Sequence, residues 1–288
     1  VGAGPAGMAC ALVAARRGHE VTLMDAADEL GGKLLCAGAA RMKFDVENYR
    51  SYLVGQVRAA EREGGLAVEL GHRAGAGELA AGCFDAIVCA AGQASELMRD
   101  PAALAGARSV VVVGGGAVGC ECAQWLSVEC GVERVCVVEA LPHMMEGACT
   151  ANRGHLLHVL ARRGVRLLNM ARVEEVRLED AAAPDSAIAL RVSRNHDRHV
   201  PDPYVSWTPV LPKNVVNPLE PRIGDDWREE GLRCDLLVLA CGGRADDGLF
   251  FELQKAHAAP ELRNLGDAFA PGRVLEAVRA AYRLGCAL

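Results

Sequence analysis

The first seven residues, VGAGPAG, constrain the fold of this chain more than any other stretch. Gly2, Gly4 and Gly7 follow the spacing G-x-G-x-x-G, between the end of a strand and a helix rich in Ala and Leu. In such a turn the first glycine permits the sharp bend, the second lets the backbone approach a diphosphate, and the third lets helix and strand pack closely. The turn therefore predicts a diphosphate resting on the unpaired N–H groups of a helix N-terminus.

The residues after this turn complete a nucleotide-binding pattern. We expect a helix over Pro5 to Arg17, a second strand over His19 to Met24, and an acid, Asp25, at the end of that strand. An acid at this place accepts hydrogen bonds from a ribose. Because strand, glycines, helix, strand and acid come in order, a mononucleotide-binding unit is favoured over an ordinary glycine turn.

A second copy of the same device follows later in the chain. The sequence GGGAVG carries its glycines after a strand of β-branched residues, and a helix, another strand and an acid come next. In chain order these are the strand Ser109 to Val113, Gly114, Gly116, Gly119, the helix from Ala117 to about Glu129, the strand Arg134 to Val138, and Glu139. Such a repeat is the strongest signal in the sequence, because two nucleotide-binding units are far less probable by chance than one.

Two further apolar strands close the two units. Phe84 to Gly92 and Cys234 to Gly243 both end in small residues, which let a ligand or another backbone pass close. The tail then offers Gly266-Asp267 and a helix over Val274 to Leu284. We expect the acid to bind a sugar-like hydroxyl and the helix start to favour negative charge.

The acid of the second unit bears on the choice of nicotinamide cofactor. A 2′-phosphate would lie about 5 Å from the Glu139 carboxylate, where the repulsion is on the order of 3 kcal/mol per unit charge at an effective dielectric near 20. No Arg or Lys follows directly, since the next residues are Ala140-Leu141-Pro142-His143. The sequence therefore favours NADH over NADPH.

The bulk composition excludes several classes of protein. A chain of 288 residues suits two domains, and its net charge of −6 gives no support to nucleic-acid binding. No apolar run has the length of a membrane span. Twelve cysteines occur without any C-x-x-C, which argues against a redox-active disulfide and against a complete iron–sulfur site in these residues. We expect buried free thiols in a reducing cytosol, with Cys89, Cys136 and Cys241 inside apolar strands.

Two further helices are predicted, and one of them carries a pair of histidines. His155 and His158 share one face of the helix Thr150 to Arg163, but no third ligand accompanies them, so no metal site is expected. A second helix, Lys43 to Glu61, is amphipathic. Its expected apolar side comprises Phe44, Tyr49, Tyr52, Leu53 and Val57.

The segment from Ser193 to Arg233 is polar and rich in proline. It is either a long surface hairpin or a segment that docks on another domain through Tyr204 and Trp207. Upstream of it, Val173 to Leu178 and Ile188 to Val192 are expected to form antiparallel strands. The chain opens without Met at the very end of its first strand, so we expect it to be a fragment of a longer protein.

Two dinucleotide folds followed by a Gly-Asp turn and a final helix resemble the two-dinucleotide flavoprotein reductases. The resemblance covers essentially the whole chain and implies an α/β fold of two Rossmann-like domains, the NAD domain inserted into the FAD domain. It implies a discontinuous FAD-binding domain over 1–106 and 245–288 and an NAD(P)H-binding domain over 107–244. The residues implied at the FAD site are Gly2, Gly4, Pro5, Ala6, Gly7, Asp25, Gly31, Gly32, Lys33, Leu34, Ala91, Gly92, Gly266, Asp267, Val274 and Leu275. Those implied at the NAD site are Gly114, Gly116, Ala117, Val118, Gly119, Glu139 and Gly242.

A narrower resemblance rests on GGKL after Asp25, on GGGAVGCECA, on YVSWTPVLPKNVVNP and on GDAFAPGRVLEAVRAAYRLG. These stretches look like the C-terminal half of 2-enoate reductases, 2,4-dienoyl-CoA reductases and trimethylamine dehydrogenase, the multidomain relatives of old yellow enzyme. The resemblance implies an N-terminal barrel of the same polypeptide that carries FMN and a 4Fe-4S cluster, neither of which has its residues here.

The implied activity is an electron relay from NADH through FAD to that barrel, which would reduce an activated C=C bond. No acid–base residue is assigned, because hydride transfer to a flavin does not need one. The alternatives are a non-redox domain that binds ADP, as the matching site of trimethylamine dehydrogenase does, and a stand-alone flavin reductase with another acceptor. A dithiol reductase resembling thioredoxin reductase is disfavoured by the missing C-x-x-C. The acceptor and the oligomeric state, including a homo-oligomer, stay open.

Overall fold

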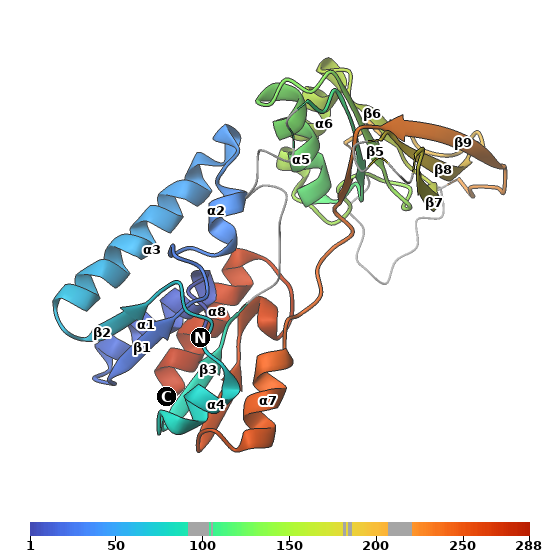
Figure 1. The fold of residues 1–288 in the computed structure, drawn as a ribbon. Coiled ribbons are helices and arrows are strands. Elements are labelled where there is room, and N and C mark those ends of the chain that lie inside the picture. The colour runs from blue at the N-terminus through green and yellow to red at the C-terminus, as the bar shows by residue number, and fades with distance from the viewer. Residues whose placement is uncertain (92–103, 105, 181–182, 184–185, 207–220) are drawn as a thin grey trace. The chain divides into compact units, whose positions relative to one another are not determined.

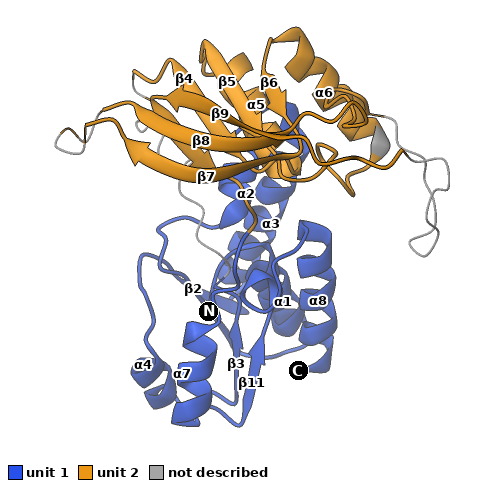
Figure 2. Cartoon of the chain, turned by 90° about the vertical axis from the view of Figure 1, so that its right-hand side faces the viewer, with its two compact units in different colours: residues 1–100, 243–288 blue, residues 101–242 orange. Residues whose placement is uncertain are grey.

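The computed structural model describes residues 1–91, 104, 106–180, 183, 186–206 and 221–288. The chain divides into two compact units, each a layered arrangement of helices and mainly parallel sheets (Figure 1). Unit 1 comprises residues 1–100 and 243–288, and unit 2 comprises residues 101–242 (Figure 2). Unit 2 is thus inserted in sequence between the two pieces of unit 1. The mixed α/β fold with parallel sheets confirms the predicted fold class.

The sheet strands of unit 1 come in two parallel pairs joined by the start of the chain. β1 (Val21–Met24) pairs with β2 (Leu66–Glu69), and β3 (Ala86–Cys89) pairs with β11 (Glu261–Asn264). Gly2 donates its N–H to Met24 O at 2.7 Å, and Ala90 donates to Val1 O at 2.7 Å. The backbone of Val1 and Gly2 therefore fills the central place between β1 and β3.

The helices of unit 1 cover these strands with small residues at their closest contacts. α1 (Pro5–Arg16) packs along α8 (Val274–Ala287), where a Cβ on Gly285 would lie 2.9 Å from Val13. α1 also contacts α3 (Phe44–Arg62), which buries Leu53 and Val57. The remaining short helices are α2 (Lys33–Ala37), η1 (Arg41–Lys43), α4 (Ala76–Ala81), α7 (Gly248–Ala256) and η4 (Gly266–Ala268).

Unit 2 repeats this plan with one parallel sheet of order β10-β4-β5-β6. Its strands are β4 (Ser109–Val113), β5 (Arg134–Val138), β6 (Arg166–Leu168) and β10 (Leu236–Leu239), with helices α5 (Ala117–Val128) and α6 (Thr150–Arg162). Each strand of this sheet has a counterpart in unit 1. β10 corresponds to β3 and β4 to the chain start at Val1 and Gly2, while β5 corresponds to β1 and β6 to β2. The described strands of unit 2 include no counterpart of β11.

A three-stranded antiparallel sheet completes unit 2. β7 (Ala171–Leu178) pairs with β8 (Ile188–Asn195), as predicted, and β8 pairs with β9 (Trp227–Cys234). Leu190, Val192 and Leu232 turn inward and pack on the parallel sheet. β9 lies inside the proline-rich segment and was not predicted as a strand.

Several surface assignments from the sequence are wrong. Phe44 and Tyr52 of α3 are 69% and 58% exposed, although they were expected on its apolar side. Cys241 is exposed rather than buried, and Cys136 is only partly buried, whereas Cys89 is buried as expected. Six of the twelve free thiols are buried.

The proline-rich segment is tied to unit 2 at its start. The Tyr204 hydroxyl donates to Val165 O at 2.7 Å and accepts from Leu167 N–H at 3.3 Å. This ring therefore anchors its own unit, which disfavours a docking role for Tyr204. Trp207 lies outside the described residues. None of the described helices is both long enough and apolar enough to cross a membrane.

Candidate functional site: two nucleotide turns

The two glycine turns have the same backbone geometry. Gly2 has φ of +104° and Gly114 has φ of +106°, in the region that side chains rarely adopt. A Cβ on Gly2 would lie 2.2 Å from Ala90 O, and one on Gly114 would lie 2.4 Å from Ala240 O. Only glycine fits either position, because each turn runs directly against the end of the closing strand.

The third glycine of each motif lets the helix approach the turn. A Cβ on Gly7 would lie 1.7 Å from Gly2 O, and one on Gly119 would lie 1.8 Å from Gly114 O. Both distances are far below any real contact with a Cβ. The role predicted for the third glycine, close packing of helix on strand, is what these distances describe.

The middle glycines face open space instead. No atom lies within 4 Å of a Cβ built on Gly4 or on Gly116, although both begin helices, α1 and α5. Neither helix start carries a side-chain cap, so their first N–H groups are available to a ligand. An open cradle next to uncapped N–H groups fits a diphosphate in both units.

Each acid is held by its own glycine turn. Asp25 accepts the Ala3 N–H at 2.5 Å through Oδ2 and the Ala27 N–H at 2.8 Å through Oδ1. Glu139 accepts the Gly115 N–H at 2.6 Å through Oε2 and the Leu141 N–H at 2.8 Å through Oε1. Two backbone donors fix each carboxylate at the end of its strand, and each oxygen keeps a lone pair for a ribose hydroxyl.

After the acids the two units diverge. In unit 1 the Gly31 N–H donates to Ala3 O at 3.0 Å, and Gly32 lies so close that its Cβ would be 2.9 Å from Gly4 Cα. Gly31 and Gly32 both have positive φ, at 127° and 52°. A second glycine loop therefore lies on the first.

In unit 2, Met145 stands where unit 1 has Gly31, six residues after the acid, and Glu146 stands where unit 1 has Gly32. Met145 donates its N–H to Gly115 O at 2.7 Å and adopts φ of 53°. Met144 and Met145 are 0% and 2% exposed, and the Met144 sulfur would lie 2.4 Å from a Cβ on Gly115. The second loop of unit 2 thus packs buried methionines against Gly115 of the turn.

The tail of the chain adds a cover in unit 1. Lys33 Nζ pairs with Asp267 Oδ2 at 2.7 Å, and Asp267 Oδ1 accepts the Gly272 N–H at 3.0 Å. Gly266 packs against the start of α1, where its Cβ would lie 2.8 Å from the Ala6 side chain. The structure therefore brings Ala6, Lys33 and Asp267 together at the first turn.

Exposure follows the same contrast. Pro5 is partly buried and Ala6 is buried, whereas Gly116 and Ala117 are exposed and Val118 is 66% exposed. Gly242, at the end of β10, is exposed with φ of 95° and open space around it. The nucleotide turn of unit 2 is thus the more accessible one within its own unit.

The remaining predicted residues fall on the edges of the first site. Leu34 is buried in the core of unit 1. Ala91 is exposed at the end of β3, and Gly92 lies outside the described residues. Val274 and Leu275 begin α8 and are 37% and 58% exposed.

The start of α8 is less positive than its dipole alone suggests. Glu276 accepts the Arg273 N–H at 2.8 Å in a capping box, which places a carboxylate in the first turn. This charge offsets part of the positive potential that the sequence predicted there.

Several supporting residues were not identified from the sequence. The backbone donors Ala3 and Gly115 orient the acids, and Cys120 donates its S–H to Gly115 O at 3.3 Å from beneath the second turn. Burial raises the pKa of the Cys120 thiol to about 12, so it stays protonated at neutral pH. No sequence pattern marks these residues apart from their position beside the glycines.

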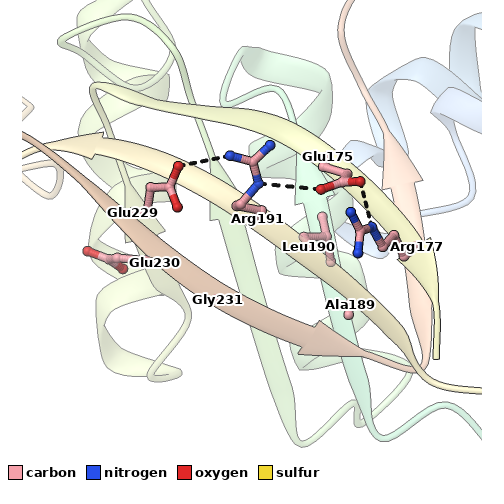
Figure 3. Close-up of a pocket in the computed structure, with 8 residues that line it drawn as sticks. All are labelled: Glu175, Arg177, Ala189, Leu190, Arg191, Glu229, Glu230 and Gly231. Atoms are coloured by element: carbon pink, nitrogen blue, oxygen red, sulfur yellow. Dashed lines mark hydrogen bonds and ion pairs between the residues drawn. The ribbon is translucent and has the colours of Figure 1, made fainter.

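Another hollow, of about 380 Å³, lies on the outer face of the antiparallel sheet (Figure 3). Arg191 reaches Glu229 at 2.8 Å and Glu175 at 3.4 Å, and Arg177 reaches Glu175 at 2.5 Å. Because these charges satisfy one another, the hollow presents no convergent group to a ligand, and we assign it no function. Among the described residues no three His, Cys, Asp or Glu side chains form a group that could hold a metal; His155 and His158 are exposed on α6.

Comparison with known protein families agrees with this geometry. Residues 34–260 match the pyridine nucleotide-disulphide oxidoreductase family, and residues 1–44 match an FAD binding domain. Together the two matches cover residues 1–260.

Relatives share the whole length of the chain. It is 26% identical over 99% of its length to an NADH oxidase of Thermoanaerobacter brockii, and 28% identical over 98% to a metal reductase of Desulforamulus reducens. The chain spans 40% and 42% of these relatives. A solved 2-naphthoyl-CoA reductase has the same fold, with a TM-score of 0.76, 22% identity, and coverage of 100% of this chain and 39% of that one.

Proposed function

Because the chain belongs to the pyridine nucleotide-disulphide oxidoreductase family, we propose that its two units form an NADH-to-FAD relay within a larger flavoprotein reductase. It is an FAD- and NAD-dependent oxidoreductase module. The observation that carries the proposal is the repeated turn, in which backbone N–H groups at equivalent positions hold the two acids. Only the turn of unit 1 is also covered by a second glycine loop and by the tail of the chain.

We assign FAD to unit 1. The open cradle at Gly4 and the N–H groups at the start of α1 would hold its diphosphate, and Asp25 would accept its adenosine ribose. Asp267, beside that cradle, would bind the ribityl chain. The other residues assigned to the site are Gly2, Pro5, Ala6, Gly7, Gly31, Gly32, Lys33, Leu34, Ala91, Gly92, Gly266, Val274 and Leu275.

We assign NADH to unit 2. Gly116, Ala117 and Val118 would receive the diphosphate at the open start of α5, with Gly114, Gly119 and Gly242 shaping the turn around it. The Glu139 carboxylate would bind the adenosine ribose. Since two backbone N–H groups fix it, it cannot swing away from a 2′-phosphate, which supports NADH over NADPH.

When bound, the flavin would accept a hydride from NADH and release electrons singly or in pairs. The chain's own residues bind and orient the two cofactors, and no acid–base side chain is required of them. The described part of the chain contains no pair of cysteines joined as a disulfide, and the Cys120 thiol beneath the second turn is buried and protonated. This supports direct flavin chemistry over a dithiol relay.

We further propose that the electrons pass to an FMN and 4Fe-4S barrel of the same polypeptide, which reduces activated C=C bonds of enoates or enoyl-CoA thioesters. The length of the relatives, of which this chain spans two fifths, supports additional domains. A reducing, cytoplasmic location suits twelve free thiols. The second candidate is a structural site for ADP; Asp267 beside the first turn, where its carboxylate could accept a ribityl hydroxyl, supports FAD.

An anaerobic absorption spectrum of the purified chain tests the relay. We expect visible flavin bands that bleach on addition of NADH and much more slowly with NADPH. A colourless protein that takes up no added FAD would refute the assignment and favour the ADP site. A yellow protein that no nicotinamide nucleotide bleaches would refute the role of unit 2 alone.

A further inference from the structure

An ion pair joins two segments of unit 1 beside the start of α1. Lys33 Nζ lies 2.7 Å from Asp267 Oδ2, although the two residues are 234 positions apart in the chain. Their side chains are only 32% and 17% exposed. A pair this sheltered from water is screened less than a surface pair, so its geometry is held more firmly than that of the exposed pairs elsewhere in the chain.

Both partners are anchored to the first glycine turn by contacts of their own. On the Lys33 side, Gly31 donates to Ala3 O at 3.0 Å and Gly32 touches Gly4. On the Asp267 side, Gly266 touches Ala6, and Gly272 donates to the second carboxylate oxygen at 3.0 Å. The pair therefore links two segments that lie on either side of the diphosphate cradle.

Unit 2 has the same turn but no such link among its described residues. Its second loop carries the buried Met145 where unit 1 has Gly31, and the exposed Glu146 where unit 1 has Gly32. Its sheet ends at β10, so the segment that would correspond to β11 and η4 is missing from the described part of the unit. The link is thus confined to the unit assigned to the flavin.

We propose that Lys33 and Asp267 form a clasp that sets how long FAD stays in unit 1. The inference rests on the proposed function. The clasp must open for a dinucleotide to enter, and once closed it holds the second glycine loop against the turn while Lys33 keeps the Asp267 carboxylate facing the ribityl chain. Lys33 is a positioning residue in this scheme and takes no part in electron transfer.

FAD release from the loaded protein tests the clasp. The protein is loaded with FAD, diluted, and followed by the rise of flavin fluorescence, for wild type, Lys33→Met, Asp267→Asn and the double variant. We expect each single variant to release FAD about tenfold faster, and the double variant no faster than the faster single, because both changes remove one interaction. Lys33→Arg, which keeps the charge, should restore slow release.

Lys255→Met provides the matched control, since it removes an exposed lysine of α7 in the same unit. It should release FAD at the wild-type rate. High salt should speed release from wild type but not from Lys33→Met, a difference that a merely structural role of Lys33 would not produce. Circular dichroism of the empty variants shows whether each is folded. If Lys33→Met does not fold, the comparison of Lys33→Arg with wild type still tests the clasp.

The outcomes separate the two proposals. A wild-type protein that takes up no FAD refutes the proposed function and the clasp with it. A wild type that binds FAD, with Lys33→Met and Lys255→Met releasing it equally fast, refutes the clasp alone. Additive effects in the double variant also refute it, since Lys33 and Asp267 would then act separately.

Discussion

Units 1 and 2 have the same glycine turn before the first helix, but they differ in the loop that follows the acid. Gly2 and Gly114 share φ within two degrees, and the carboxylates of Asp25 and Glu139 each accept two N–H groups from equivalent backbone positions. What differs is the loop after the acid, where unit 1 has Gly31 and Gly32 and unit 2 has the buried Met145 and the exposed Glu146. From this comparison we infer that the glycine motif provides the cradle in both units, and that the residues beyond the acid set how far the site closes.

This division fits two cofactors with opposite requirements. A flavin that remains with the enzyme benefits from a covered site, because residence time is governed mainly by the rate of release. A nicotinamide nucleotide must leave after every turnover, so an open site such as that at Val118 suits it. Variants that act on one unit and spare the other test this contrast directly.

The largest expected effect comes from the third glycines. Gly7→Ala would place a Cβ 1.7 Å from Gly2 O, and Gly119→Ala would place one 1.8 Å from Gly114 O. Since backbone cannot move aside cheaply, each change should lower the unfolding free energy by about 3 kcal/mol or more. Denaturant unfolding of the empty protein measures this. A loss below about 1 kcal/mol would show that the helix can shift away from the turn.

The middle glycines should show the reverse pattern. Gly4→Ala and Gly116→Ala add a methyl into open space, so the empty protein should keep its stability to within about 0.5 kcal/mol. Each should nevertheless lose one cofactor, because the methyl occupies the cradle. We expect Gly4→Ala to fail to retain FAD while Gly116→Ala keeps FAD but binds NADH at least about a hundredfold more weakly, or about 3 kcal/mol.

Equilibrium binding of FAD and of NADH to Gly4→Ala and Gly116→Ala checks whether each variant loses only the cofactor assigned to its own unit. If both variants lost the same cofactor, the assignment of cofactors to units would be wrong. Substitutions at the third glycine of a motif should thus change the stability of the protein, whereas substitutions at the middle glycine should change cofactor binding.

The sequence was sufficient for the parts of the fold that glycine geometry dictates. Both turns, their helices and their acids could be predicted, because a positive φ or a close backbone contact permits only one residue type. The face of α3 could not be read from its aromatics: its buried stripe runs through Val46, Tyr49, Leu53 and Val57 at helical spacing, and Phe44 and Tyr52 fall off it.

Other features were beyond any local pattern. β9 is an edge strand whose exposed face is charged, so its sequence WREEGLRC resembles a polar loop. The residues of the Lys33–Asp267 pair could each be assigned to the FAD site, but the pair itself depends on two segments meeting through the tertiary fold. The sequence was therefore enough to propose candidate residues, but the contact between Lys33 and Asp267 could not be predicted from it.

A smaller effect is expected at the acids. Glu139→Gln should reduce the preference for NADH over NADPH roughly tenfold to a hundredfold, because it removes the charge that repels a 2′-phosphate. Asp25→Asn is the matched control in unit 1: it removes the same kind of carboxylate from the same kind of turn. It should weaken FAD binding and leave the NADH-to-NADPH ratio of flavin reduction unchanged. A shifted ratio in Asp25→Asn, or none in Glu139→Gln, would contradict the assignment.

The smallest expected effect uses a thiol that only one unit offers. Cys241 is exposed at the end of β10, next to the backbone of the second turn, where unit 1 has Ala91. NADH bound at that turn should slow alkylation of Cys241 about tenfold, since occupancy of the site limits access to the sulfur. The exposed Cys83 of unit 1 supplies the internal reference, because its alkylation should not respond to NADH. Peptide mass spectrometry after brief labelling reports both thiols in one sample. Protection of Cys241 by FAD rather than by NADH would place the flavin in unit 2 and reverse the comparison, whereas protection by NADH and not by FAD would locate the exchangeable nucleotide at the open turn.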